Sequence, residues 1–242
     1  MSLVEELGER KIIDLILECL DQMPNMPVPF GDDVSAIDIG HGKLAVIKTD
    51  MLVGKTDVPP AMNLWQAARK AVVMNISDLA AKGVQPIALL ASIGIPKGLS
   101  KKDIQQIGKG LNDGAREYNA YVLGGDTNEA SDLVISCVAL GICQKRYLIK
   151  RSGAKPSDYV AVTGFFGKTA SGLKILLKNL SAPPDVKEKL VNAAFMPCAR
   201  LKEGLALAQT RAATASIDSS DGLAWSLHEI SRASNVGFVI DN

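Results

Sequence analysis

The sequence predicts an α/β N-terminal domain with a mixed sheet, followed by an α+β C-terminal domain that is incomplete. Up to Gln144, short apolar runs alternate with longer segments whose apolar residues recur at helical spacing, as in a sheet backed by helices. From Gln144 to Asp158 the chain becomes basic and rich in turn residues, and a strand pattern then begins again. We therefore predict two domains, residues 1–144 and 145–242.

The first half is predicted to run helix, strand, strand, helix, strand, helix, strand, strand. Pro59-Pro60 and Gly83 bound the second helix, and Ser100 with Asp103 forms a capping box at the start of the third. Pro86 and Pro96 enclose a continuous apolar run that is typical of a buried strand. Helices are expected at 3–20, 61–82 and 100–118, and strands within 30–38 and at 44–47, 88–95, 121–123 and 133–142.

The second half is predicted to begin with a strand at 159–163. The glycine turn 164–167 then connects this strand to a helix. Helices are expected at 169–177, 183–194, 200–212 and 223–233, and a last strand at 236–241. That strand needs a neighbour for its backbone groups, so the C-terminal domain looks unfinished.

Composition excludes several classes of partner. Lys+Arg 27 against Asp+Glu 26 leaves a net charge of +1, so no global field attracts nucleic acid or an anionic membrane. No apolar run reaches the roughly 20 residues that span a bilayer, and the N-terminal segment is amphipathic and unlike a signal peptide. We expect a cytoplasmic enzyme or binding protein. Its four cysteines, which show no metal-ligand spacing, are expected to be reduced core residues: Cys19, Cys137, Cys143 and Cys198.

Six aspartates lie at or near the ends of apolar segments, each within two residues of Gly, Ser, Thr or Asn. A single such residue is usually a cap or turn former, but several converging carboxylates would repel one another unless cations neutralise them. Oxygen ligands of this kind suit Mg²⁺, and the absence of neighbouring His and Cys argues against zinc. The two histidines, His41 and His228, are interpreted as structural. The six are Asp33, Asp50, Asp78, Asp126, Asp218 and Asp221.

Three further features bear on phosphate binding. Arg151 lies in the basic segment and is either part of a solvated linker or a guanidinium clamp on phosphate. Gly-Lys-Thr occurs at 54–56 and 167–169, but the preceding glycine of a P-loop is missing from both. The turn 164–167 is either a simple tight turn or an anion-binding helix start. With the acids, these features indicate phosphoryl transfer by positioning and charge neutralisation.

The spaced motifs resemble those of thiamine-monophosphate kinase, a family within the superfamily of aminoimidazole ribonucleotide synthetase. The resemblance covers nearly the whole chain in the family's order. It rests on Gly31-Asp32-Asp33, Thr49-Asp50-Met51-Leu52-Val53, the segment from Asn75 to Gly83, Gly124-Gly125-Asp126-Thr127, Arg151-Ser152-Gly153-Ala154 and Asp218-Ser219-Ser220-Asp221-Gly222-Leu223.

The resemblance implies a homodimer, formed through the N-terminal domain, that transfers the γ-phosphoryl group of ATP to thiamine monophosphate with Mg²⁺. No protein nucleophile is expected, since a phosphate oxygen of the substrate attacks in line. The resemblance assigns ATP contacts to Gly125, Asp126, Arg151 and Ser220, and a substrate contact to Asp57. It assigns Mg²⁺ to Asp33, Thr49, Asp50, Asp78, Asp126, Asp218 and Asp221.

The chain departs from the family pattern in two places. Lys55-Thr56-Asp57-Val58 stands where many members have Gly-Val-His-Phe, and the later Gly-Gly-Glu-Asp-Tyr-Glu motif and final aromatic residue are missing. Two alternatives stay open. One is another superfamily enzyme, above all aminoimidazole ribonucleotide synthetase, although the motifs at 75–83 and 151–154 favour the kinase. The other is a catalytically impaired nucleotide-binding fragment.

Overall fold

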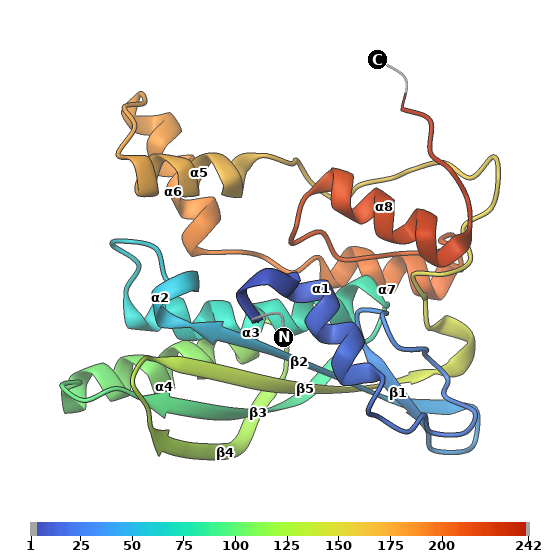
Figure 1. The fold of residues 1–242 in the computed structure, drawn as a ribbon, viewed down its shortest axis with the longest axis horizontal. Helices are drawn as coiled ribbons and strands as arrows, with labels where there is room; N and C mark the ends of the chain where they lie inside the picture. The colour runs from blue at the N-terminus through green and yellow to red at the C-terminus, as the bar shows by residue number, and fades with distance from the viewer. Residues whose placement is uncertain (1–3, 241–242) are drawn as a thin grey trace.

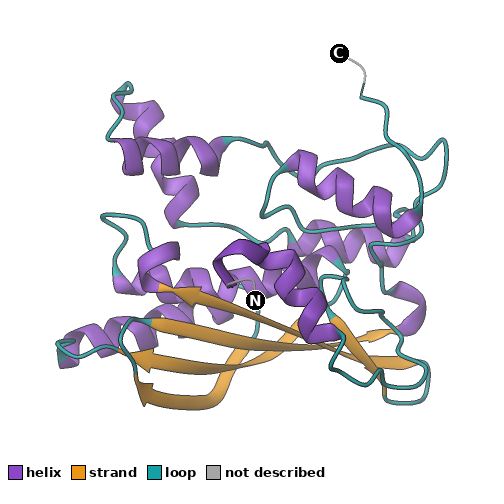
Figure 2. Cartoon of the chain, in the orientation of Figure 1, coloured by secondary structure: helices purple, strands orange, loops and turns teal. Residues whose placement is uncertain are grey.

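The computed structural model describes residues 4–240 and contains one mixed five-stranded sheet in the order β1-β2-β5-β3-β4. Only the β3–β4 pair is parallel, and the other neighbouring strands in the sheet are antiparallel. The helices gather on one side of the sheet (Figures 1 and 2). The expected mixed sheet backed by helices is therefore confirmed.

In the first half the elements follow the predicted order, with β2, β4 and the short α2 as the main differences. The strands are β1 (Ser35–Asp38), β2 (Lys43–Val53), β3 (Pro86–Ile95), β4 (Tyr121–Glu129) and β5 (Val134–Gln144). The helices are α1 (Val4–Leu17), α2 (Gly54–Asp57), α3 (Leu64–Ala81), α4 (Lys101–Arg116), α5 (Lys168–Lys178), α6 (Pro184–Phe195), α7 (Leu201–Thr210) and α8 (Leu223–Ser234), with a 3₁₀ turn η1 (Lys145–Tyr147).

Helix α3 is the central helix of the fold. The Asn63 side chain accepts a hydrogen bond from the Gln66 backbone while the Gln66 side chain accepts one from Asn63, so this capping box sets the start of α3 three residues after the predicted one. Gly83, with φ of +68°, lies just past its end. Alanine and valine dominate its buried residues, which pack against β2 and β5 on one side and α4 on the other. The long apolar pattern at 61–82 thus becomes a core helix.

Strand β2 presents alternate residues to α3. Leu44, Val46 and Leu52 are buried in the core, and the two-residue period places Lys48 and Asp50 on that same face. The strand is eleven residues long, so Lys48-Thr49-Asp50 lies within it and not after its end. Two charged side chains therefore point from the sheet toward the helix.

Strand β4 also extends further than predicted. The strand is predicted to end at Leu123, but pairing with β3 continues through Gly124-Gly125-Asp126 to Glu129. At Gly125, a Cβ atom would lie 1.7 Å from the Ala91 carbonyl oxygen, so only glycine lets β4 approach β3 here. Backbone pairing has overridden the local turn preference.

The second half contains helices but no strands among the described residues, so the predicted strands are not found at 159–163 or 236–240. Residues 159–163 and 236–240 form no strand, because no other segment supplies a partner for their backbone groups; position 241 lies outside the described residues. Helix α7 packs on α3, and Ala194, Phe195 and Leu201 join the same core as α3. At Gly204, a Cβ atom would lie 1.8 Å from the Ala80 carbonyl oxygen, so the two helix backbones nearly touch.

Two of the cysteine predictions are wrong. Cys137 is buried and Cys143 is partly buried, but Cys19 and Cys198 are exposed. Cys19 follows α1, and Cys198 lies in the loop before α7. Both positions are outside the packed elements, so apolar neighbours in the sequence did not place these side chains in the core. All four are free thiols, as expected. Among the helices that the structure describes, none combines the length and apolar character needed to cross a bilayer.

Candidate active site

Three carboxylates from distant parts of the chain converge. Asp33 lies in the loop before β1, Asp78 in α3 and Asp218 in the loop before α8. Each offers one oxygen, and these oxygens lie within 4.8 Å of one another. Asp33 and Asp78 are buried, and Asp218 is partly buried. We call these three residues the acidic cluster.

Polar side chains of α3 position the neighbouring elements. Asn75 Oδ1 accepts a hydrogen bond from the Asp50 backbone at 2.9 Å, while Asn75 Nδ2 donates to the Ala71 carbonyl at 3.0 Å. This fully buried amide fastens β2 to α3 at the level of Asp50. Ser77 Oγ donates to Asp218 Oδ2 at 3.4 Å, so the same helix also holds the loop of the second half.

Three cations surround the acids. Lys48 Nζ lies 3.1 Å from both Asp50 Oδ1 and Asp78 Oδ2. Lys82 Nζ forms ion pairs with Asp32 at 2.7 Å and Asp33 at 2.8 Å. The site therefore carries internal counter-charges on both sides of the cluster.

Arg151 is the third cation, and it is not a solvated linker residue. Its Nε donates to Asp33 Oδ1 at 2.7 Å, and its backbone nitrogen donates to Asp32 Oδ2 at 2.9 Å. The guanidinium also reaches the Gly31 carbonyl and Glu229. A residue at the start of the second half thus fixes the Gly31-Asp32-Asp33 turn of the first half.

Burial and like charges shift the acids of the cluster. Burial first, and then Asp218, raise the pKa of Asp78 to about 8, although Lys48 opposes the change. Burial and then Asp33 raise the pKa of Asp218 to about 6. Burial lowers the pKa of Lys48, but Asp78 and Asp50 outweigh it, so its pKa is raised overall. The cluster takes up protons unless another cation compensates its charge.

The other predicted site residues lie around this cluster or away from it. Thr49 faces opposite to Asp50 and donates to the Cys137 carbonyl at 3.0 Å. Asp126 is exposed on β4, where register aligns it with Ser92, Ser136 and Met51 on the sheet face opposite to Asp50. Gly125 precedes it on the same strand. The last two, Ser220 and Asp221, are exposed in the loop before α8.

Asp57 makes contacts that stabilise the short helix α2. Its Oδ2 accepts a hydrogen bond from the Val53 backbone at 2.7 Å, and its carbonyl accepts one from Lys70 Nζ at 2.9 Å. The carboxylate therefore closes the turn of α2. Its predicted contact with substrate stays a prediction.

Sequence reasoning missed Lys48, Lys82, Asp32 and Glu229 as members of the charged network. A signal existed for two of them. Lys48 lies two residues before Asp50 and so shares its strand face, and Lys82 lies one helical turn after Asp78. Asp32 and Glu229 depend on contacts with Arg151, 119 and 78 residues away, which no local pattern shows.

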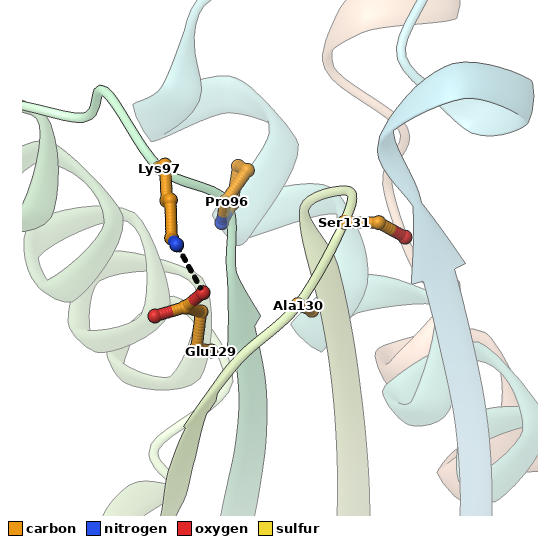
Figure 3. Close-up of a pocket in the computed structure, with 5 residues that line it drawn as sticks. All are labelled: Pro96, Lys97, Glu129, Ala130 and Ser131. Atoms are coloured by element: carbon orange, nitrogen blue, oxygen red, sulfur yellow. Dashed lines mark ion pairs between the residues drawn. The ribbon is translucent and has the colours of Figure 1, made fainter.

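A surface hollow lies elsewhere, at the ends of β3 and β4 (Figure 3). It is lined by Pro96, Lys97, Glu129, Ala130 and Ser131, with Lys97 Nζ 3.0 Å from Glu129 Oε1. Both of these charged side chains are mostly exposed. None of the acidic cluster lines this hollow, so the chemistry is better located by the buried charges than by surface shape.

Comparison with known proteins first shows which class the chain resembles, the AIR synthase related proteins. Residues 31–143, which include Asp33, Asp50, Asp78 and Asp126, match the family model described as AIR synthase related protein, N-terminal domain. A structure described as AaThiL complexed with AMPPCP and TMP has a TM-score of 0.87 at 26% identity, covering 97% of this chain and 73% of that one. The thiamine monophosphate kinase structure from Aquifex aeolicus gives 0.82 at 26% identity, covering 96% and 74%.

Comparison of sequences then identifies one family within this class, the thiamine-monophosphate kinases. The thiamine-monophosphate kinase of Pyrococcus horikoshii is 40% identical over 236 residues, which are 98% of this chain and 72% of that protein. The chain belongs to the thiamine-monophosphate kinase family.

Proposed function

We propose that this chain catalyses ATP-dependent phosphorylation of thiamine monophosphate to thiamine diphosphate, by direct in-line transfer of the γ-phosphoryl group. The observation that carries the proposal is the acidic cluster, three carboxylates from both halves of the chain held within 4.8 Å by elements of a kinase-family fold. Phosphoryl transfer needs positioning and charge neutralisation more than covalent chemistry, and the cluster supplies sites for both.

The donor set fits Mg²⁺. Every ligand atom in the cluster is an oxygen, and Mg²⁺ prefers carboxylates supplemented by water and substrate phosphates. Among the described residues, Asp33 Oδ2 is the one buried side-chain oxygen or nitrogen that makes no hydrogen bond, and its ion-pair partner is Lys82 Nζ at 2.8 Å, so this oxygen lies where a cation is already accommodated. Asp33, Asp78 and Asp218 would hold Mg²⁺, with Asp50 beside them. Thr49, Asp126 and Asp221 stay proposed Mg²⁺ ligands, and because Thr49 and Asp126 face away from Asp50 they would serve an ion other than the one in the acidic cluster.

The chain's own residues bind and orient the reacting phosphates. When bound, Mg²⁺ would neutralise phosphate charge and stabilise the charge that spreads over the transferred group. Arg151 lies at the edge of the cluster, where its guanidinium donates to Asp33, the Gly31 carbonyl and Glu229. We assign to it a contact with a phosphate of ATP, which would share or replace one of these partners. We assign further ATP contacts to Gly125, Asp126 and Ser220. The acceptor phosphate oxygen is the nucleophile, so no protein nucleophile is required.

The open face of the sheet supports a homodimer through the N-terminal domain. Large apolar side chains are exposed there, including Leu123 at 72%, Met51 at 57% and Leu90 at 50%. Exposed apolar patches of this kind mark association surfaces. Because Asp126 lies on the same face as Met51, away from Asp50, we propose that it meets ATP at the dimer interface. Light scattering should give twice the chain mass of 25.7 kDa.

We also propose the domain division at 144/145, where β5 ends and η1 begins. The cluster then draws Asp33 and Asp78 from the first domain and Asp218 from the second.

The function is tested by a coupled assay of ADP release. Thiamine monophosphate should stimulate Mg²⁺-dependent turnover, and thiamine diphosphate should appear in equal amount. Turnover that ignores thiamine monophosphate but responds to a ribonucleotide substrate would point to the aminoimidazole ribonucleotide synthetase alternative. ATP binding with no turnover on either substrate would favour the nucleotide-binding fragment.

Binding of Mg²⁺ should release protons near neutral pH. Because burial and Asp218 raise the pKa of Asp78 to about 8, this carboxyl is mostly protonated at pH 7 in the metal-free protein. A cation needs the carboxylate, so affinity should rise between pH 6 and pH 9. Calorimetry in buffers of different ionisation enthalpy should detect release of about one proton at pH 7 and much less at pH 9. A binding heat that is independent of buffer would contradict this prediction.

A further inference from the structure

We propose that Lys48 is a built-in counter-cation of the cluster, which competes with Mg²⁺ for Asp50 and Asp78 and is displaced when the metal binds. This inference rests on the proposed function, because it takes the cluster as the Mg²⁺ site. It concerns a residue that the metal, ATP and substrate assignments leave without a role.

The position of Lys48 is the first argument. Its Nζ lies 3.1 Å from Asp50 Oδ1 and 3.1 Å from Asp78 Oδ2, and so it bridges a strand and a helix. The two-residue period of β2 places it on the face that packs against α3, between the buried residues Val46 and Leu52. The ammonium therefore lies among the carboxylates and not at the solvent edge.

The charges around Lys48 are the second argument. Asp78 also faces Asp218 and Asp33, so four carboxyl groups share this space. On the far side of the cluster, Lys82 and Arg151 neutralise Asp32 and Asp33. Within residues 4–240, no cation other than Lys48 forms an ion pair with Asp50 or Asp78, so Lys48 alone compensates this side of the cluster.

The third argument is that the Lys48 ammonium and a bound Mg²⁺ exclude each other, both sterically and electrostatically. A divalent ion ligated by Asp78 would lie within a few ångströms of Nζ, and like charges at such separations repel strongly in a partly buried site. The lysine side chain is flexible and 19% exposed, so its ammonium can leave toward solvent while its stem stays packed. Exchange of one cation for another keeps the repulsion between the carboxylates compensated in both states.

The test measures metal binding without nucleotide. Mg²⁺ is titrated by calorimetry into the EDTA-treated and dialysed full chain at pH 8.5, where proton competition is small. Lys48→Met keeps the apolar stem and removes the charge, and we expect its Kd for Mg²⁺ to fall at least about tenfold. The Mg²⁺-induced rise in Tm should grow in the same variant, because tighter binding to the folded state gives more stabilisation.

Two controls separate charge from structural damage. Lys48→Arg retains the cation and should bind Mg²⁺ within about twofold of the wild type. Lys43→Met removes the same charge from an exposed position on the same strand and should leave the Kd unchanged. Damage to the fold can only weaken binding, so a tighter Kd in Lys48→Met cannot arise from misfolding.

The outcomes distinguish this inference from the function on which it rests. An unchanged or weaker Kd in Lys48→Met overturns the inference while leaving the Mg²⁺ site intact, and this is the result expected if Lys48 serves only as a phosphate ligand. Failure of the wild type to bind Mg²⁺, or equal binding by Asp78→Asn, overturns the metal site and the inference together.

Discussion

Asp78→Asn should reduce Mg²⁺-dependent turnover at least about a hundredfold while leaving the protein folded. Asp78 has an oxygen in the acidic cluster, and an amide cannot replace the charge of a carboxylate ligand. The substitution also removes one of several mutually repelling acids, so the metal-free protein should not lose stability. ADP release and thermal unfolding in EDTA, measured on the same preparation, check both halves of this prediction.

The matched control is Asp185→Asn, which makes the same change at an exposed position in the first turn of α6. It should leave turnover near the wild-type level. Asp50→Asn should resemble Asp78→Asn in activity, because Asp50 lies beside the cluster and shares the contact with Lys48. Full activity in both Asp50→Asn and Asp78→Asn would refute the metal-site assignment.

Lys82→Met should lower the free energy of unfolding by about 3 to 5 kcal/mol, the usual cost of removing one partner from a buried ion pair. The Lys82 side chain is 1% exposed, and its Nζ contacts Asp32 Oδ1 at 2.7 Å and Asp33 Oδ2 at 2.8 Å. It also donates to the Ser216 carbonyl at 2.7 Å. The methionine would leave two buried carboxylates and one carbonyl without this partner. Urea denaturation measures the change.

Lys109→Met provides the control, since Lys109 is exposed on α4 and the net change in charge is identical. It should alter stability by less than about 0.5 kcal/mol. A loss of less than about 1 kcal/mol in Lys82→Met would mean that the neighbouring acids are neutralised without it.

The first half of the fold is readable from sequence because its elements are long and periodic. Helix α3 has a sustained apolar pattern ended by Gly83, and α4 has the capping box of Ser100 and Asp103 that was predicted. The second half was harder to predict. The apolar segment 159–163 has the composition of a strand, but a strand exists only when another segment pairs with it. Composition alone carries no information on that partner.

Sequence reasoning singled out the three acids that come together in the cluster, and it missed the lysines beside them. Aspartates beside glycine and serine after apolar runs stand out locally, and Asp33, Asp78 and Asp218 do come together. Lysines appear throughout a neutral sequence, and only the packing of β2 on α3 shows that Lys48 is enclosed. The guanidinium clamp at Arg151 was considered, but its link to Asp32 and Asp33 required the contact between the two halves.

The near-contact between α3 and α7 has a thermodynamic consequence. Gly204 meets the Ala80 carbonyl, and the Ser216 backbone further along is held by Lys150 and Lys82, so the loop that carries Asp218 is aligned only after α7 has docked. If the acidic cluster is the Mg²⁺ site, high metal affinity belongs to the docked arrangement alone. By linkage, each tenfold excess of Mg²⁺ over its Kd adds about 1.4 kcal/mol to the docking of the second half on α3. A metal bound at the proposed site would therefore act as a structural ligand for the whole chain as well as a partner in phosphoryl transfer.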